Sequence, residues 1–219
     1  MTSAARTDPP AGEARHAAPI LGLSVFLATE LMFFGPLLFG YAYGRLHFPD
    51  AFAAASRHTD LALGSINTAL LLTSSATMAA AAALRRAEAV KAARLLLWST
   101  AALGAAFLVI KGIEYAHEWQ EHLFPGASFA FSGAGQGGGA RFFYFLYFCM
   151  TGLHAVHLGI GIAIVCVFAI GLQRGKAAFA GAGRIELGGL YWHFIDVIWI
   201  FLYPLLYLVG RSAATGGPG

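Results

Sequence analysis

Charged residues are scarce in this 219-residue chain. Aspartate, glutamate, lysine and arginine together make up only 11% of it, whereas hydrophobic residues make up 58%. A soluble domain carries about 25% charged residues, so the composition argues against a soluble globular fold and predicts a membrane protein. The net charge of +3 comes from basic residues clustered between apolar runs, a pattern that sets membrane orientation rather than one that binds nucleic acid.

Cysteine is rare as well, with only Cys149 and Cys166 in the chain. Both fall in one apolar run, where a straight helix would place them about 25 Å apart. That separation is too large for a disulfide bond between them. We therefore expect both to act as small apolar packing residues.

Five apolar runs are each long enough to cross a bilayer as a helix, which takes roughly 20 residues. Their approximate limits are Ala18 to Gly44, Leu61 to Leu84, Leu95 to Tyr115, Phe142 to Leu172 and Leu187 to Gly210. The sequence therefore predicts an all-α fold, a polytopic membrane bundle of five transmembrane helices in residues 18–211. Residues 1–17 lack the apolar core of a signal peptide and are expected to form a polar cytoplasmic tail, and residues 212–219 a short carboxyl-terminal tail.

Lysine and arginine are unevenly distributed between the two ends of these runs. The loop after the second run and the loop after the fourth run hold Arg85, Arg86, Lys91, Arg94, Arg174, Lys176 and Arg184. Basic residues are retained on the cytoplasmic side, so both loops are predicted to be cytoplasmic. This orientation puts the amino terminus inside and the carboxyl terminus on the periplasmic side.

Ionisable residues lie inside the apolar runs, where hydrocarbon makes them costly. Glu30 is near the middle of the first run, His154 and His157 are near the middle of the fourth, and His193 and Asp196 are in the fifth. On neighbouring helices, a carboxylate and an imidazole could share a hydrogen bond or a proton. The simplest interpretation is hydrogen bonding between helices, and Glu30 is in addition a candidate proton-transfer group.

Two other classes of membrane protein would use the same residues. His154 and His157 are three positions apart on one helix face, so they cannot bind both sides of one haem, and a membrane cytochrome would need His193 as well. A proton-coupled transporter built on Glu30 and Asp196 is the other hypothesis, although no internal repeat of the transporter kind stands out.

The segment from Lys111 to His122 concentrates histidine and glutamate, so a metal site is conceivable there. The H-E-x-x-H pattern fails, however, because Glu121 stands where the second histidine is needed. We expect a solvated helix end with no metal, in which Lys111 and Glu114 pair on one helix face.

Four further residues are candidates for contacts with lipid or with a neighbouring subunit, because they are aromatic or polar residues within or beside the apolar runs. They are Asn67, Trp119, Trp192 and Trp199. Asn67, together with Ser74 and Ser75, also gives the second run hydrogen-bonding capacity toward other helices.

Five segments of the chain resemble subunit III of haem-copper oxidases, in the same order. They are FLATELMFFG around Glu30, GSINTALLLTSS around Asn67, KGIEY around Glu114, TGLHAVHLGIG around His154 and His157, and YWHFIDVIWIFLYPLLYLVG in the last run. The resemblance covers nearly the whole chain from the first run onward. The chain is similar to the five-helix bacterial form of this family, the cytochrome c oxidase subunit III family.

The resemblance implies an accessory subunit with no redox centre or catalytic residue of its own. Haem and copper would be held by the catalytic subunit I beside it, with subunit II and other respiratory subunits in the same complex of the bacterial inner membrane. The complex would act as a proton-translocating cytochrome c oxidase, with phospholipid bound to subunit III. By position, Glu30 resembles the family's buried carboxylate, and the residues that resemble its polar bundle residues are Glu114, His154, His157, His193 and Asp196.

One departure from the mitochondrial pattern is the absence of the first two of seven helices. This absence leaves the lipid-holding cleft in doubt and the electron donor open, since five-helix versions also look like those of bacterial quinol oxidases and of subunits associated with nitric oxide reductase. A subunit III-like component of such a complex is therefore the alternative.

Overall fold

The structure is a computed structural model that describes residues 11–126, 129–131, 137–175 and 180–212, and in the first helix the side chains of residues 22, 25 and 28 onward. The chain divides into two units, Met1–Phe39 and Gly40–Gly219. The first unit contains most of α1 (Ala11–His47), a single long helix that continues into the second unit. Cys149 and Cys166 are both free and lie on one helix, α5, as the sequence predicts.

The described residues are almost entirely helical and contain no strand. After α1 come α2 (Pro49–His58), α3 (Leu61–Arg86), α4 (Val90–Gln120), α5 (Gly137–Gln173), α7 (Ala182–Tyr203), the π-helical turn η1 (Pro204–Leu208) and α8 (Val209–Ser212). Four segments of the described residues are long and apolar enough to cross a membrane: Leu61–Arg86, Val90–Gln120, Gly137–Gln173 and Ala182–Arg211. These four correspond to the last four predicted runs, so the chain is a helical membrane-type protein.

The first predicted membrane run and the tail before it are not confirmed in the form predicted. Residues 18–44 are helical, but α1 is not among the four candidate spans found in the described residues. The helix also begins at Ala11, inside the stretch predicted to be the polar tail. The short helix α2 was not predicted, and most of the carboxyl-terminal tail, residues 213–219, lies outside the described residues.

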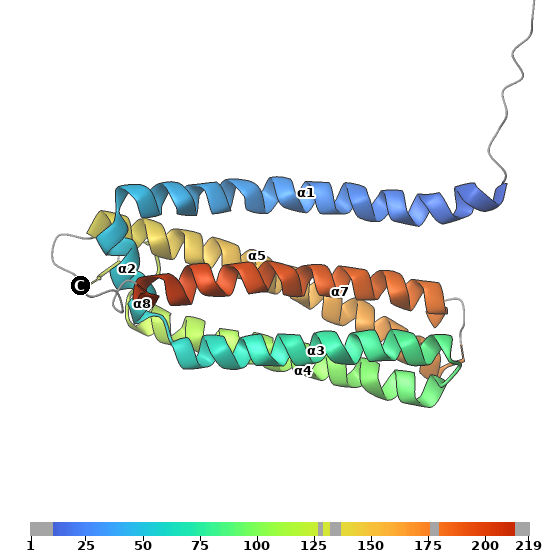
Figure 1. The fold of residues 1–219 in the computed structure, drawn as a ribbon. Helices are drawn as coiled ribbons and strands as arrows, with labels where there is room; N and C mark the ends of the chain where they lie inside the picture. The colour runs from blue at the N-terminus through green and yellow to red at the C-terminus, as the bar shows by residue number, and fades with distance from the viewer. Residues whose placement is uncertain (1–10, 127–128, 132–136, 176–179, 213–219) are drawn as a thin grey trace, which may run out of the picture. The chain divides into compact units, whose positions relative to one another are not determined.

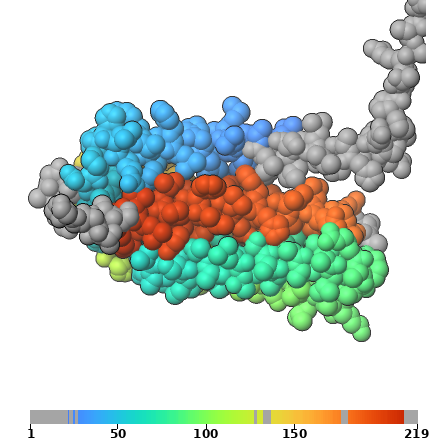
Figure 2. Space-filling view, in the orientation of Figure 1, coloured from blue at the N-terminus to red at the C-terminus, as the bar shows by residue number. Residues whose placement is uncertain are grey.

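Four helices of the second unit pack in a ring: α4 contacts α3 and α5, and α7 contacts the same two helices (Figure 1). Figure 2 shows α3 and α7 side by side on one face of this unit. All but one of the buried residues of α4 recur at alternating intervals of four and three residues, the exception being Ala101. They are Ala93, Leu97, Thr100, Gly104, Phe107, Lys111, Glu114 and Glu118. A repeat of 3.5 residues is the pattern of left-handed helical bundles, in which one stripe of each helix faces its neighbours.

The outward faces of the same helices are apolar. Ile66, Val109, Ile113, Val156 and Ile160 are each about half exposed or more. A soluble protein rarely exposes so large an apolar surface, whereas lipid or a neighbouring membrane subunit would cover it. The bundle therefore has a mixed polar and apolar interior and a largely apolar exterior.

Side chains and backbone fix where the helices begin and end. Asp60 precedes α3 and accepts hydrogen bonds from the backbone N–H groups of Ala62 (2.9 Å) and Leu63 (3.1 Å), which is a helix N-cap. Both α3 and α4 end in a left-handed residue, Glu88 (φ 58°) and His122 (φ 57°). The following amide bonds back to Leu84 and Glu118 respectively, which completes a Schellman motif at each end.

The last membrane segment is interrupted by Pro204, which lacks the N–H that an α-helix needs. The chain forms the π-helical turn η1 there and then continues as α8. Such turns re-aim the side chains that follow. In this protein the turn carries Tyr207, whose side chain is completely buried in the bundle.

Close packing at Gly104 leads to a first prediction. A Cβ at this position would lie 2.8 Å from Cη2 of Trp192 and 3.1 Å from Cγ1 of Ile162. Because the Trp192 ring is fully buried and rigid, Gly104→Ala should lower the free energy of unfolding by about 1–3 kcal/mol. Denaturant titration in detergent micelles, followed by circular dichroism, measures this change.

Gly112 on the same helix is the matched control, since a Cβ there would meet nothing within 4 Å. Gly112→Ala should be neutral or stabilising by up to about 1 kcal/mol, because alanine favours helix. Equal effects of the two substitutions would show that α4 and α7 do not approach each other at Gly104.

Candidate functional site

A buried ion pair lies inside the bundle of the second unit. Lys111 and Glu114, three residues apart on α4, are each only 3% exposed, and Lys111 Nζ donates a hydrogen bond to Glu114 Oε2 at 3.0 Å. The spacing of the two residues predicts this pairing, and the structure confirms it. The pair lies within the membrane-crossing segment Val90–Gln120, where an uncompensated charge would be very costly.

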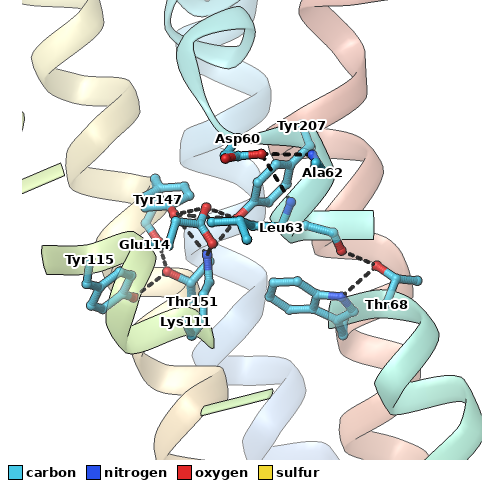
Figure 3. A network of polar contacts seen from close by, with 12 residues as sticks. Asp60, Ala62, Leu63, Thr68, Lys111, Glu114, Tyr115, Tyr147, Thr151 and Tyr207 are labelled. Atoms are coloured by element: carbon cyan, nitrogen blue, oxygen red, sulfur yellow. Dashed lines mark hydrogen bonds and ion pairs between the residues drawn. The ribbon is translucent and has the colours of Figure 1, made fainter. Parts of the chain in front are cut away.

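Two tyrosines complete this cluster, which we call the Lys111 cluster: Lys111, Glu114, Tyr147 and Tyr207 (Figure 3). Lys111 Nζ donates to the hydroxyl of Tyr147 at 2.8 Å and to that of Tyr207 at 2.5 Å. Both hydroxyls in turn donate to Glu114 Oε1, at 2.8 Å and 2.5 Å. The positive charge therefore has three acceptors and the negative charge has three donors.

The cluster joins three segments of the chain, since Tyr147 belongs to α5 and Tyr207 to η1. Aromatic rings also surround the ammonium group, which lies 4.7 Å from the ring centroid of Tyr147 and 5.5 Å from that of Trp199. Cation–π contacts of this kind stabilise a cation removed from water. The arrangement neutralises the charges and fixes three elements together, and it leaves neither charge free for chemistry on a substrate.

His154 occupies the next layer of the bundle. Its side chain is 1% exposed and packs against the rings of Phe107 (5.5 Å) and Trp199 (5.1 Å). Neither ring nitrogen has a hydrogen-bond partner among the described residues. The expected hydrogen bond from His154 to another helix is absent among the described residues, and aromatic rings pack against the imidazole instead.

Polar side chains of α3 bind α7 along their contact. Trp192 Nε1 donates to Ser74 Oγ at 3.1 Å, and His193 Nδ1 is 2.6 Å from Ser75 Oγ. Trp199 Nε1 donates to Thr68 Oγ1 at 3.0 Å. The prediction that Ser74 and Ser75 hydrogen-bond to another helix is confirmed. The same prediction fails for Asn67, whose side-chain amide has no hydrogen-bond partner among the described residues.

Three of the four residues predicted to contact lipid or a neighbouring subunit are buried inside the helical bundle. Asn67 and Trp192 are 0% exposed and Trp199 is 1% exposed, so they pack within the bundle rather than against lipid or a neighbouring subunit. The indole N–H groups of Trp192 and Trp199 donate to Ser74 and Thr68 there. These tryptophans therefore do not need a position at the membrane–water interface to satisfy the N–H group. Trp119, by contrast, is 63% exposed at the end of α4.

The remaining predicted polar residues do not converge on one site. Asp196 is 3% exposed and neither of its carboxylate oxygens has a hydrogen-bond partner within the described residues. His157 Nδ1 is 2.8 Å from the carbonyl of Leu153 on its own helix. Glu30 lies on α1 in the first unit.

Two features of the site were not predicted from the sequence. One is the role of Tyr147 and Tyr207 as partners of Lys111 and Glu114, and the other is the burial of Glu118. Tyrosine favours the ends of membrane helices, so a tyrosine within an apolar run is a signal that it has a polar partner. Glu118 was expected on a solvated helix end, but it is only 5% exposed. It lies four residues after Glu114 and so continues the buried face of α4.

The described residues contain no group of three or more His, Cys, Asp or Glu side chains arranged to hold a metal ion. His154 and His157 both lie on α5, and His154 packs against the rings of Phe107 and Trp199. The fold and the site together define a polytopic helical membrane protein in which the Lys111 cluster and the α3–α7 hydrogen bonds join helices to one another.

Comparison with known proteins narrows this class to one family. The family model for cytochrome c oxidase subunit III matches residues 16–211. The chain is 31% identical over 194 residues to cytochrome c oxidase subunit 3 of Alkalihalophilus pseudofirmus, covering 87% of this chain and 86% of that protein. It is 30% identical over 194 residues to cytochrome c oxidase subunit 3 of Thermostichus vulcanus (88% of each chain) and 30% identical over 193 residues to quinol oxidase subunit 3 of Bacillus spizizenii (87% of each).

The chain belongs to the cytochrome c oxidase subunit III family, as its sequence motifs predict. Its function is that of an accessory subunit III of a haem-copper oxidase in the respiratory chain. The family match extends across the Lys111 cluster and the α3–α7 contacts.

Proposed function

We propose that this chain binds beside the catalytic subunit I of a proton-translocating oxidase in the bacterial inner membrane and carries no redox centre itself. The observation that carries the proposal is the match to the subunit III family over residues 16–211. The hydrogen bonds within the Lys111 cluster also support the proposal. An accessory subunit needs its buried polar groups to be hydrogen-bonded, whereas a catalytic subunit needs polar groups that a substrate can reach. Haem and copper belong to the catalytic subunit I in this proposal, and phospholipid covers the exposed apolar faces.

The proposed orientation has the amino terminus in the cytoplasm and the carboxyl terminus in the periplasm, with α1 as a fifth transmembrane helix. Arg85 donates to the carbonyl of Ala180 (3.3 Å) and Arg86 to Glu186 (3.0 Å), so the two basic loops lie at the same end of the bundle. This arrangement supports a single cytoplasmic face.

Arginines at the opposite end have structural partners that explain why they are there. Arg57 Nη1 donates to the carbonyl of Gly210 at 3.1 Å, and Arg211 donates to the carbonyls of Tyr207, Arg57 and Thr59 at 2.8–2.9 Å. These bonds satisfy backbone oxygens at the end of the last membrane segment. These bonds account for Arg57 and Arg211, whereas Arg45 and Arg141 also flank the apolar runs at that end, so the charge bias is clear but incomplete.

Cytochrome c is the proposed electron donor, and quinol is the second candidate. Relatives named cytochrome c oxidase subunit 3 are 30–31% identical to the chain, and a relative named quinol oxidase subunit 3 is 30% identical. The donor is determined by partner subunits, so the test uses membranes from cells with and without the gene for this chain. Loss of oxygen uptake with reduced cytochrome c but not with quinol supports the proposal, and the reverse pattern overturns it in favour of a quinol oxidase.

A further inference from the structure

Polar side chains lie along the contact between α3 and α7, which Figure 2 shows side by side on one face of the second unit. We call this line of contact the α3–α7 seam. Three pairs of polar side chains follow it from one end of the bundle toward the other: Arg86–Glu186, Ser75–His193 and Ser65–Tyr203. All six residues are exposed or partly exposed, so the seam forms a polar line on a largely apolar surface.

The middle pair lies deep within the membrane-crossing segments. Ser75 is 11 residues from Arg86, the nearer end of α3, which corresponds to about 16 Å of helix. The hydrocarbon core of a bilayer is about 30 Å thick. Ser75 Oγ and His193 Nδ1, which are 2.6 Å apart, therefore lie near the middle of the membrane.

His193 has one ring nitrogen left for a second partner. Nδ1 contacts Ser75 Oγ, but Nε2 has no hydrogen-bond partner among the described residues and is accessible at the surface of the bundle. Lipid chains offer no hydrogen-bonding group at this depth, where an unsatisfied polar group is costly. A polar side chain from a neighbouring protein would satisfy this nitrogen, whereas lipid would not.

Apolar residues surround His193 on the surface. On α7, Leu190 (54% exposed) and Val197 (47% exposed) lie three residues before it and four residues after it, on the same helix face. On α3, Ala76 and Ala79 are both exposed. Such small side chains allow the backbone of another membrane helix to approach closely, and a polar group within the contact adds a hydrogen bond. Hot spots of protein interfaces have the same form, a central group enclosed by contacts that exclude solvent.

We propose that the α3–α7 seam is the face on which this chain docks to the catalytic subunit. The occupant is a transmembrane helix of that subunit, with a hydrogen-bonding side chain opposite Nε2 of His193 and apolar side chains against Leu190 and Val197. Hydrogen bonds along the seam hold α3 and α7 together, so the docking face is in place before the partner binds. The docking face deepens the proposed function, because it presupposes that the chain binds beside the catalytic subunit.

Site-specific photocross-linking in intact membranes tests which face meets the catalytic subunit. p-Benzoylphenylalanine replaces Phe201, which is 62% exposed on α7 and lies about two helical turns after His193. The matched control replaces Phe145, which is 49% exposed on α5, the helix across the ring from α3. Both changes keep an aromatic ring at an exposed position. We expect a cross-link to the catalytic subunit from position 201 and none above background from position 145.

Removal of the ring nitrogens tests the hydrogen bond itself. His193→Phe should speed the release of this chain from the purified oxidase complex in detergent by about 3- to 15-fold, the usual effect of one hydrogen bond between membrane helices. Native mass spectrometry follows the release. Ser75→Ala is the control, because it breaks only the hydrogen bond within the chain and leaves Nε2 available. It should have the smaller effect, whereas a purely internal role of His193 would make the two variants equal.

The docking face is overturned if position 201 cross-links only to lipid, to α1 of the same chain or to another subunit. It is also overturned if position 145 cross-links to the catalytic subunit as strongly as position 201, or if His193→Phe and Ser75→Ala are released equally fast. If His193→Phe does not fold, the cross-links alone decide. In each of these cases the chain still co-purifies with the catalytic subunit, so the proposed function stands. Absence of the catalytic subunit from the purified complex would instead contradict the proposed function, and the docking face with it.

Discussion

Replacing Lys111 by methionine is expected to lower the free energy of unfolding by about 3–5 kcal/mol, the cost of breaking a buried ion pair. The substitution leaves Glu114 charged and 3% exposed, and it removes the shared donor that holds the hydroxyls of Tyr147 and Tyr207. Because these residues come from α4, α5 and η1, three segments should loosen together. Denaturant titration of the purified protein in detergent micelles, followed by circular dichroism, gives the change.

Two controls separate the buried pair from charge loss in general. Arg86→Met breaks the exposed ion pair with Glu186, whose side chains are 61% and 40% exposed, and should cost less than about 1 kcal/mol. The double variant Lys111→Met with Glu114→Gln should be more stable than Lys111→Met alone, since it removes the stranded negative charge. A Lys111→Met protein as stable as the unaltered one would show that the cluster does not hold these helices together.

Trp192→Ala is expected to cost about 3–5 kcal/mol, as large-to-small changes in a packed core do. The Trp192 side chain is 0% exposed, donates to Ser74, and packs closely against Gly104 and Gly161. Its removal leaves a cavity between helices whose contact rests on van der Waals packing, since lipid supplies little hydrophobic driving force. The same unfolding measurement quantifies the loss.

Trp119→Ala is the matched control, because it deletes the same side chain from a position that is 63% exposed. It should change the free energy of unfolding by less than about 0.5 kcal/mol. If the two tryptophan variants lose the same stability, Trp192 is not the packing centre that the structure assigns to it.

Much of the bundle could be predicted from residue patterns alone. Apolar runs located the last four membrane segments, and the spacing of Lys111 and Glu114 predicted their ion pair. A further signal was present but unused. The buried stripe of α4 includes Ala93, Leu97, Thr100, Gly104 and Phe107. It continues at the same spacing through Lys111, Glu114 and Glu118, which places these charges on the buried face of the helix.

Other features depend on contacts between distant segments and could not be predicted from local patterns. The partners of Lys111 are Tyr147 and Tyr207, 36 and 96 residues away. Tyr207 reaches the cluster through the π-helical turn that begins at Pro204. A cavity of about 330 Å³ likewise combines His58 and Asp60 with the end of α4, which no motif within either segment indicates.

Affinity purification of the tagged chain in mild detergent tests the account most directly. The co-purifying subunits are identified by mass spectrometry, and the visible spectrum is recorded before and after the subunits are separated. The account predicts a haem-copper catalytic subunit among the partners and no haem on this chain after separation. Isolation of the chain without an oxidase subunit, or with stoichiometric haem bound to it, would contradict an accessory role.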